Sequence, residues 1–297
     1  MDYTVVAERL VKRFGYTVAL KGVTFTASKG LTLIVGPNGS GKTTLLKILA
    51  GLVKPTSGRV TVLGLNPWTE RSRLMSRASI AIEGYPLPWW MNGRELARHV
   101  SRLWRVPLES LLESLQHLGV TGYWDKKIIG YSSGMRKRLS LALGLVGDRE
   151  LYIVDEPFSN LDTGSVRAVV ERINGLAMES SVIMATHIVP PGLSRIDRLL
   201  VLVDGEAFHG LEERAPILLV EARVASGEEA RKIIDSVADA VPEAASRVYY
   251  APKAGTVRME LSMAEAERIR RLLPGVQASI YVNPNLPQYV PFQRPTQ

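Results

Sequence analysis

Apolar residues fall into short runs along the first part of the chain, and these runs predict strands. Residues 3–35 are expected to form short strands, and the last run, LTLIVG at residues 31–36, is apolar apart from Thr32 and predicts a buried strand. The runs LYIVDEP at residues 151–157 and SVIMATH at residues 181–187 have the same character. Because uniformly apolar strands are typical of a parallel sheet covered on both faces, the pattern predicts an α/β core.

Helical periodicity separates these runs. TTLLKILAGL at residues 43–52 has an apolar side and is expected to end at Gly51. KPTSGRVTVLG at residues 54–64 predicts a turn and a strand. Residues 70–146 are expected to be mostly helical, with a proline- and tryptophan-rich interruption at residues 84–93. LLVLVDGEAFHG at residues 199–210 predicts a closing hairpin with its turn at Asp-Gly.

The last part of the chain follows a different order. It runs strand, helix, strand, strand, helix, strand, which predicts a small α+β domain of the βαββαβ, ferredoxin-like kind, followed by a proline-rich irregular tail. We therefore expect a large domain at residues 1–211, with an antiparallel β subdomain and a helical subdomain at about 84–146, and a small accessory domain at 212–297. A length of 297 residues suffices for one large and one modest core.

Charge is distributed unevenly between these two parts. Residues 212–297 carry 11 basic and 11 acidic side chains, so residues 1–211 carry the remaining 26 basic and 18 acidic ones, and with them the whole excess of +8. Such an excess fits nucleic acid, an anionic membrane surface or only a soluble basic surface. The absence of cysteine excludes disulfides and thiolate metal sites, and four scattered histidines argue against a zinc centre.

Neither a membrane span nor a secretory signal is predicted. The longest apolar runs fall far short of the roughly 20 residues that cross a bilayer. The start, MDYTVVAERL, lacks a basic segment followed by an apolar core and a cleavage site. The chain is therefore expected to stay inside the cell.

The loop GPNGSGKT at residues 36–43 carries the strongest chemical signal. Gly36, Gly39 and Gly41 let the backbone pass close to a polyphosphate, and the next helix presents unpaired N–H groups to the anion. Lys42 is expected to reach the β and γ phosphates, and the Thr43 hydroxyl to ligate Mg²⁺. The other loop positions predicted to contact the nucleotide are Asn38, Ser40 and Thr44.

A pair of acids follows the second buried strand. The carboxyl ends of parallel strands meet at one edge of the sheet, so Asp155 and Glu156 are expected to point at the crevice that holds the phosphate loop. Asp155 is predicted to hold Mg²⁺ through water, and Glu156 to orient or deprotonate the attacking water.

Between these sites, YSSGMRKRLSLALGL at residues 131–145 makes a resemblance specific. The order of phosphate loop, Ser132-Ser133-Gly134 signature, acidic strand end, SNLD at residues 159–162 and a lone His187 resembles the ATP-binding subunit of ABC transporters over about residues 3–211. In that family two subunits sandwich two ATP molecules. The resemblance therefore implies that Ser132 and Gly134 contact the γ phosphate bound to a second copy of this chain or to a homologous subunit.

Other roles follow from the same resemblance. Phe14 matches the aromatic residue that stacks on adenine, although Tyr16 competes for this role and Phe14 could instead be a core residue. His187 matches the switch histidine that hydrogen-bonds the γ phosphate. Asn160 and Asp162 match a loop that crosses the dimer interface.

The sequence departs from the family pattern at the signature and at Glu83. The family usually has glutamine where Glu83 stands, in a loop that touches Mg²⁺ and the attacking water; glutamate can still ligate the metal but adds negative charge beside the γ phosphate. Ser133 replaces the usual second glycine. Met135, which replaces glutamine, and the basic cluster after it resemble drug and small-molecule exporters of the family.

The helical region indicates where a partner binds. Arg94, Arg98, Arg102 and Arg105 are spaced to share one helix face, just after Trp89 and Trp90. In the family this region grips the membrane subunit, and aromatic and arginine residues are enriched in interface hot spots. The alternative is a solvated arginine face with two buried tryptophans.

We therefore expect an ATPase that hydrolyses MgATP to drive a separate transmembrane permease at the cytoplasmic face of the membrane, with no nucleic acid bound. The alternative is a soluble ABC-type ATPase that acts on nucleic acid. DNA-repair members carry a long coiled-coil insertion, for which Lys42 and Ser132 are too close, and translation-type members usually carry two cassettes. A P-loop kinase leaves the signature and His187 unexplained.

Overall fold

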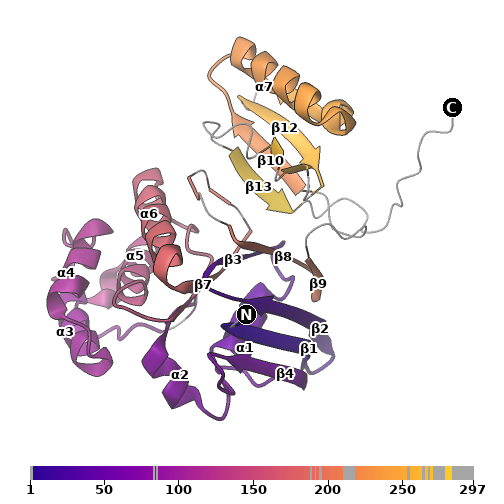
Figure 1. Ribbon diagram of the computed structural model, residues 1–297. Helices are drawn as coiled ribbons and strands as arrows, with labels where there is room; N and C mark the ends of the chain where they lie inside the picture. Colours follow the sequence, from indigo (N-terminus) through magenta and orange to yellow (C-terminus); the bar gives the residue numbers. More distant parts are fainter. Residues whose placement is uncertain are drawn as a thin grey trace.

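A six-stranded sheet forms the centre of the first part of the protein (Figure 1). The computed structural model describes residues 3–82, 84, 86–187, 189–190, 192–193, 196–209, 218–252, 255–262, 265–266, 268–269 and 278–282. In the order β5-β6-β7-β3-β8-β9, the strands are β5 (Ala78–Ala81), β6 (Leu151–Asp155), β7 (Ser181–Thr186), β3 (Gly30–Val35), β8 (Arg198–Val203) and β9 (Glu206–His209). Neighbours are parallel except β8 and β9, which form the predicted hairpin around Asp204 and Gly205.

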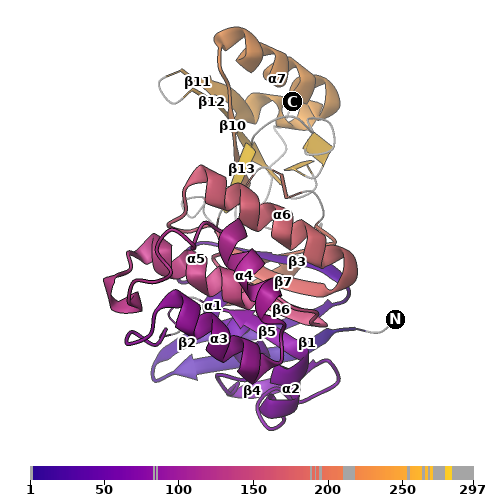
Figure 2. The same ribbon diagram turned by 90° about the vertical axis from the view of Figure 1, so that its left-hand side faces the viewer.

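Helices cover this sheet and extend to one side of it (Figures 1 and 2). They are α1 (Lys42–Leu49), α2 (Arg71–Arg77), α3 (Gly93–Trp104), α4 (Leu108–His117), the short 3₁₀ helix η1 (Ile128–Gly130), α5 (Ser133–Gly144) and α6 (Thr163–Glu179). Helix α4 packs against both α3 and α5, so these three helices form one cluster. The predicted helical character of this region is therefore confirmed.

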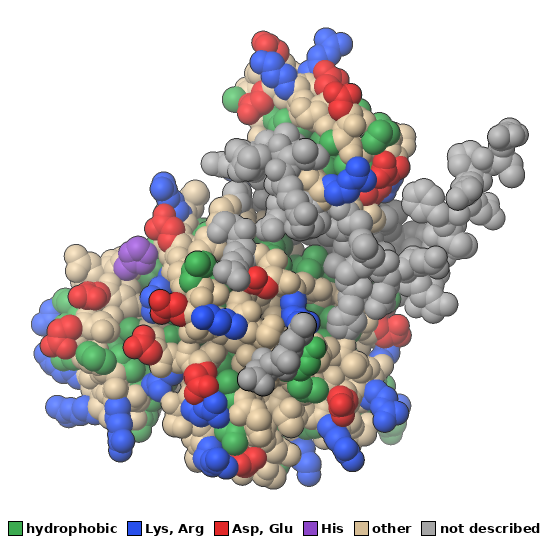
Figure 3. Space-filling model, in the orientation of Figure 1, with side chains coloured by type: hydrophobic (Ala, Val, Ile, Leu, Met, Phe, Trp, Pro, Cys, Tyr) green, Lys and Arg blue, Asp and Glu red, His purple; other side chains and the backbone are tan. Residues whose placement is uncertain are grey.

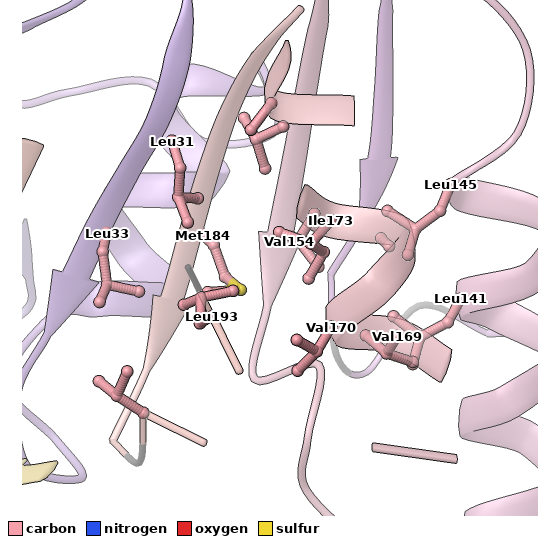
Figure 4. Packing of buried hydrophobic residues seen from close by; sticks show 14 of the residues in the cluster. Leu31, Leu33, Leu141, Leu145, Val154, Val169, Val170, Ile173, Met184 and Leu193 are labelled. Carbon is pink, nitrogen blue, oxygen red and sulfur yellow. The ribbon is translucent and has the colours of Figure 1, made fainter. Parts of the chain in front are cut away.

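Two apolar layers enclose the parallel strands because side chains alternate along each strand. Leu31 and Leu33 of β3, with Val154 of β6 and Met184 of β7, lie on the side of α5 and α6 (Figure 4). Ile34 lies in the opposite layer, with the buried leucines of α1. Each fully buried leucine or isoleucine contributes about 2 kcal/mol to this packing. The carboxyl ends of the strands are thereby held at fixed positions at one edge.

A three-stranded antiparallel sheet adjoins the layer of α1. Its strands, in the order β2-β1-β4, are β2 (Thr17–Ala27), β1 (Val5–Phe14) and β4 (Ser57–Val62). The register of β1 against both neighbours shifts between positions 7 and 13, where the alternation of the sequence is only rough. The short strands expected at residues 3–35 are thus two long strands and β3.

The sequence did not indicate one short strand, and it misplaced one arginine. Residues 70–146 contain the strand β5, whose four residues pair only with β6, more than 70 positions away. No local periodicity marks so short a strand. Arg105 does not share the helix face of Arg94, Arg98 and Arg102, because it adopts a left-handed conformation with φ of 54° as the C-cap of α3.

The last part of the chain forms a second sheet. Its elements are β10 (Leu218–Arg223), α7 (Gly227–Ala240), η2 (Pro242–Arg247), β11 (Val248–Ala251), β12 (Thr256–Leu261) and β13 (Ala278–Val282), and residues 265–266 and 268–269 are helical. The strand order β11-β12-β10-β13, antiparallel throughout, confirms the predicted βαββαβ arrangement. The expected domain boundary and the proline-rich tail lie outside the described residues.

Charges of both signs are mixed over the surface. On the face shown in Figure 3, Lys and Arg side chains alternate with Asp and Glu over both parts of the protein. Within the described ranges, none of the helices has the length and apolar character needed to cross a membrane.

Candidate active site

The loop between β3 and α1 is packed so tightly that two of its glycines have no space for a side chain. A Cβ atom on Gly36 would lie 2.0 Å from the Leu202 carbonyl oxygen, and one on Gly41, whose φ is +103°, would lie 2.5 Å from that of Ala19. Gly41 is also the N-cap of α1, and no side chain caps this helix. The loop therefore presents backbone N–H groups and the positive end of α1, which together form an anion site.

Lys42 is buried at the start of α1, with 5% of its surface exposed. Its ammonium donates to the carbonyls of Gly36 and Pro37, at 2.8 and 3.0 Å, and lies 3.3 Å from Glu156 Oε1. The Lys42 ammonium therefore lies against the phosphate loop, beside the place where the phosphates are expected to bind.

Thr43 and Asp155, both predicted as magnesium ligands, lie in contact. The Thr43 hydroxyl donates to Asp155 Oδ2 at 2.7 Å, although the two residues lie 112 positions apart. Asp155 ends β6 and is fully buried. A hydroxyl and a carboxylate are the hard oxygen ligands that Mg²⁺ prefers, so these residues fit a magnesium ion beside the phosphate loop.

Glu156 bridges Lys42 and His187. Its Oε2 lies 2.7 Å from His187 Nδ1 and accepts a hydrogen bond of 3.3 Å from the His187 backbone N–H. Glu156 is buried and has φ of +45°. Such a left-handed conformation costs a non-glycine residue about 1 kcal/mol or more, and it re-aims the side chain just after β6. The structure thus brings the three predicted catalytic residues, Lys42, Glu156 and His187, into one chain of contacts.

The serine-glycine signature forms the N-terminus of α5. Ser132 is the N-cap, and its hydroxyl accepts a hydrogen bond from the Met135 backbone N–H at 3.2 Å. Ser132 and Ser133 are both exposed, so the extra side chain of Ser133 meets no crowding within this chain. Among the described residues, no hydrogen bond joins Ser132 or Gly134 to loop 36–44.

The remaining predicted residues lie around this centre. Ser40 is buried and its hydroxyl has no hydrogen-bond partner within the described residues, whereas Asn38 is exposed and Thr44 is half-buried in the first turn of α1. Phe14 is 50% exposed at the end of β1, with the Lys12 ammonium 4.7 Å from its ring centre, so it is not a core residue. Tyr16 is fully exposed. Glu83 lies outside the described residues.

Two basic residues of α5 contact the loop that carries Glu156, which the sequence reading missed. The Lys137 ammonium donates to the Asp155 carbonyl at 3.1 Å, and Arg138 lies 3.7 Å from Asp162 Oδ2. Asp162 caps α6, and the Ser165 backbone N–H that it accepts lowers the pKa of Asp162. The basic cluster was visible in the sequence, but no local signal tells which of its side chains face the loop.

The aromatic and arginine residues before and on α3 form a surface patch, which we define as Trp89, Trp90, Arg94, Arg98 and Arg102. The two tryptophans are 60% and 57% exposed, so the alternative of buried tryptophans is wrong. Their rings meet edge to face, with centres 5.5 Å apart. Arg94 stacks on Trp124 at 4.3 Å and lies 3.4 Å from Asp125, so this arginine is held in place.

Comparison with known proteins places this site in a family. The family model described as "ABC transporter" matches residues 20–159. The uncharacterized ABC transporter ATP-binding protein YdbJ of Bacillus subtilis (strain 168) is 33% identical over 203 residues, which cover 67% of this chain and 66% of YdbJ. The Nod factor export ATP-binding protein I of Rhizobium sp. (strain N33) is 31% identical over 220 residues, which cover 72% of this chain and 71% of that protein.

Solved structures agree on the fold. The dimeric post-hydrolysis state of an ATP-binding cassette bound to ADP and Pi has a TM-score of 0.60 at 21% identity, covering 69% of this chain and 98% of the other. The ATP binding subunit of an ABC transporter has a TM-score of 0.63 at 21% identity, covering 71% and 92%. From these matches and relatives, the chain belongs to the ABC transporter ATP-binding proteins, and its first part has the fold of their ATP-binding cassette.

Proposed function

We propose that this chain works as one half of a dimer that hydrolyses MgATP at the cytoplasmic face of a membrane and powers a separate permease subunit. The main support is the chain of contacts from Lys42 through Glu156 to His187. The residues next to Lys42 and Glu156 in the sequence, Thr43 and Asp155, form the oxygen pair. A catalytic base, a phosphate-binding cation and a metal site thereby lie together at one edge of the sheet.

Each residue has a distinct task in the hydrolysis. Lys42 and the N-terminus of α1 bind the phosphates, and Thr43 and Asp155 would hold a magnesium ion, which supplies positive charge to the phosphate oxygens. Glu156 orients the attacking water and takes its proton as the water oxygen bonds to the γ phosphorus. The bond from that phosphorus to the β–γ bridging oxygen breaks, so ADP and phosphate leave. His187 Nδ1 is engaged by Glu156, which leaves Nε2 as the ring nitrogen for the γ phosphate.

A second chain completes the site in this proposal. Ser132 and Gly134 lie at the exposed start of α5 and are not hydrogen-bonded to the phosphate loop of their own chain. A helix N-terminus with an exposed serine suits the γ phosphate of a nucleotide held by another subunit. The partner is a second copy or a homologous ATPase subunit.

Mixing two inactive variants tests this dimer. Lys42→Met removes phosphate binding but keeps the signature, whereas Gly134→Asp keeps Lys42 and blocks the signature with a charge. If each signature serves the partner's ATP, the mixture recovers about a quarter of wild-type turnover, because half of the dimers are mixed and each has one intact site. Phosphate release by either variant alone is the control. No recovery from a mixture shown by cross-linking to contain mixed dimers would contradict the proposed arrangement.

The surface patch of Trp89, Trp90 and α3 is the proposed contact with the permease. Exposed aromatic rings beside arginines, of which Arg94 is held in place by Trp124 and Asp125, are typical of interface hot spots. Met135 and the basic residues after it favour an exporter of drugs or other small molecules, and one relative is named as a Nod factor export protein. In this proposal the permease subunit, and not the cassette, contacts the transported compound.

We propose further that residues 212–297 form an accessory domain outside the catalytic chemistry. In this part Val220, Met259 and Ile233 are buried among the described residues, so the sheet and α7 have apolar packing of their own. A chain ending at Gly210 is expected to hydrolyse MgATP, although its dimer affinity falls if the domain supplies contacts. Turnover is measured over a range of protein concentrations. A folded truncated chain that is inactive at every concentration would contradict the prediction.

A further inference from the structure

We call residues 155–162 the catalytic loop. Three residues of helix α5 contact this loop. Gly134, in the first turn, is so close that a Cβ atom there would lie 2.8 Å from the Asn160 carbonyl oxygen. One turn later, the Lys137 ammonium donates to the Asp155 carbonyl at 3.1 Å, and Arg138 lies 3.7 Å from Asp162 Oδ2. Lys137 and Arg138, adjacent on one helix, therefore contact the two opposite ends of the catalytic loop.

The catalytic loop includes two left-handed residues that are not glycine. Glu156 has φ of +45° and Asn160 has φ of +59°. Such conformations persist only where the surroundings hold them. The Glu156 N–H donates to the Ala185 carbonyl at 2.8 Å, and the Glu156 carbonyl accepts the Ser159 hydroxyl at 2.9 Å. The carbonyl of Asp155, on the other side of the same peptide bond, accepts Lys137.

Three groups thus bond to the backbone on either side of Glu156, and Lys137 is the one that comes from the helical cluster. The Ala185 carbonyl belongs to β7 of the sheet, and Ser159 belongs to the catalytic loop itself. Arg138 is fixed in its turn, because it lies over the ring of Tyr123 at 5.6 Å, and the Tyr123 hydroxyl donates to the Met135 carbonyl at 3.3 Å. Burial raises the pKa of Tyr123 to about 12, so this hydroxyl keeps its proton at physiological pH. These contacts connect α5 to the catalytic loop.

We propose that Lys137 is a positioning residue for ATP hydrolysis, which sets the Asp155–Glu156 peptide and with it the place of the Glu156 carboxylate. The inference rests on the proposed function, and it adds a connection within one chain. The signature at the start of α5 contacts the partner's ATP, and Lys137 on the same helix positions the base that acts on the chain's own ATP. ATP bound at one site of the dimer thereby orders the base at the other. Arg138 holds the far end of the catalytic loop at Asp162.

The test compares Lys137→Met with Lys126→Met in the full-length chain. Methionine keeps the length of lysine but donates no hydrogen bond, and Lys126 is an exposed lysine on the surface of the same helical region. Lys137→Met is expected to lower kcat for ATP tenfold or more, since misplacing a catalytic group by about 1 Å can cost about a hundredfold. KM for ATP is expected to stay within about twofold, because no phosphate contact is lost. Lys126→Met should match the wild type.

Rescue and combination separate positioning from a general loss of structure. Lys137→Arg restores a donor and is expected to recover most of kcat. If the Lys137→Met chain does not fold, Lys137→Gln replaces it in the test, because the glutamine amide is too short to reach the Asp155 carbonyl. The same loss, confined to kcat, is then expected. In an E156Q chain the residual turnover should not fall further when Lys137→Met is added, and ATP should still induce a dimer on gel filtration.

The outcomes distinguish this inference from the function on which it rests. A wild-type chain without MgATP hydrolysis would contradict the proposed function. A Lys137→Met chain with wild-type kcat, or one changed only in KM, would overturn the positioning role while the proposed function stands. A double variant that loses the full factors of both single variants would also overturn it, because the two residues would then act independently.

Discussion

Replacing Glu156 with Gln is expected to lower ATP turnover by a factor of about 10² to 10⁴, the usual contribution of a positioned general base. Glutamine has nearly the same shape as glutamate but cannot take the proton of the attacking water. The carboxylate also lies 3.3 Å from the Lys42 ammonium, the group expected to bind the phosphates. Removing its charge frees Lys42 from this ion pair, so ATP binding is expected to be kept or tightened.

Persisting ATP should then hold two chains together. Gel filtration with MgATP is expected to show a dimer for Glu156→Gln and a shorter-lived one for the wild type, and phosphate release measures the turnover. Glu179→Gln, at the exposed end of α6, is the control and should behave as wild type in both assays. Near-normal turnover of the Glu156→Gln chain would remove Glu156 from the role of base.

Gly51→Ala is expected to destabilise the cassette by about 3 kcal/mol or more, through the end of the helix that follows the phosphate loop. Gly51 has φ of +65°, and its N–H and that of Leu52 bond to the carbonyls of Ile48 and Lys47 at 3.0 and 2.8 Å. This is the Schellman ending of α1. A Cβ atom on Gly51 would lie 1.9 Å from the Pro67 carbonyl oxygen, so the backbone at Pro67 or the end of α1 must move.

Gly119 provides a matched control because it ends α4 in the same way. Its φ is also +65°, and its N–H and that of Val120 bond to the carbonyls of Gln116 and Leu115 at 2.9 and 2.8 Å. A Cβ atom there would meet only the Arg138 guanidinium, at 3.8 Å. Gly119→Ala should therefore cost about 1 kcal/mol, the cost of the left-handed conformation alone. Urea unfolding followed by tryptophan fluorescence measures both, and equal losses would show that the contact with Pro67 is relieved cheaply.

The phosphate loop was predictable because its chemistry is local. Glycines, lysine and threonine follow one another between a buried strand and a helix, and the end of α1 was marked by Gly51 before the close approach of Pro67 was known. The roles of Asp155 and Glu156 could be predicted from one rule, that parallel strands end at a common edge. The roles of Ser132, Phe14 and His187 were inferred from the family resemblance, because no general rule assigns a function to a single serine, phenylalanine or histidine from its position in the sequence.

Other features depended on contacts between distant residues. Strand β5 exists because four residues after α2 pair with β6. Arg105 leaves the face of α3 because it is the left-handed C-cap of that helix, and Trp89 and Trp90 are exposed before its start; residue spacing encodes neither feature.

The sequence by itself determined the order of the elements apart from β5, the phosphate loop, the acidic strand end and the βαββαβ arrangement of the last part, since each depends on a periodicity or on a short motif. Only the tertiary structure decided that Lys42, Glu156 and His187 form one chain of contacts, and that Lys137 and Arg138 face the catalytic loop. The physical reason is that consecutive basic side chains on a helix point in different directions. The packing of α5 against the catalytic loop decides which of these side chains contact the loop.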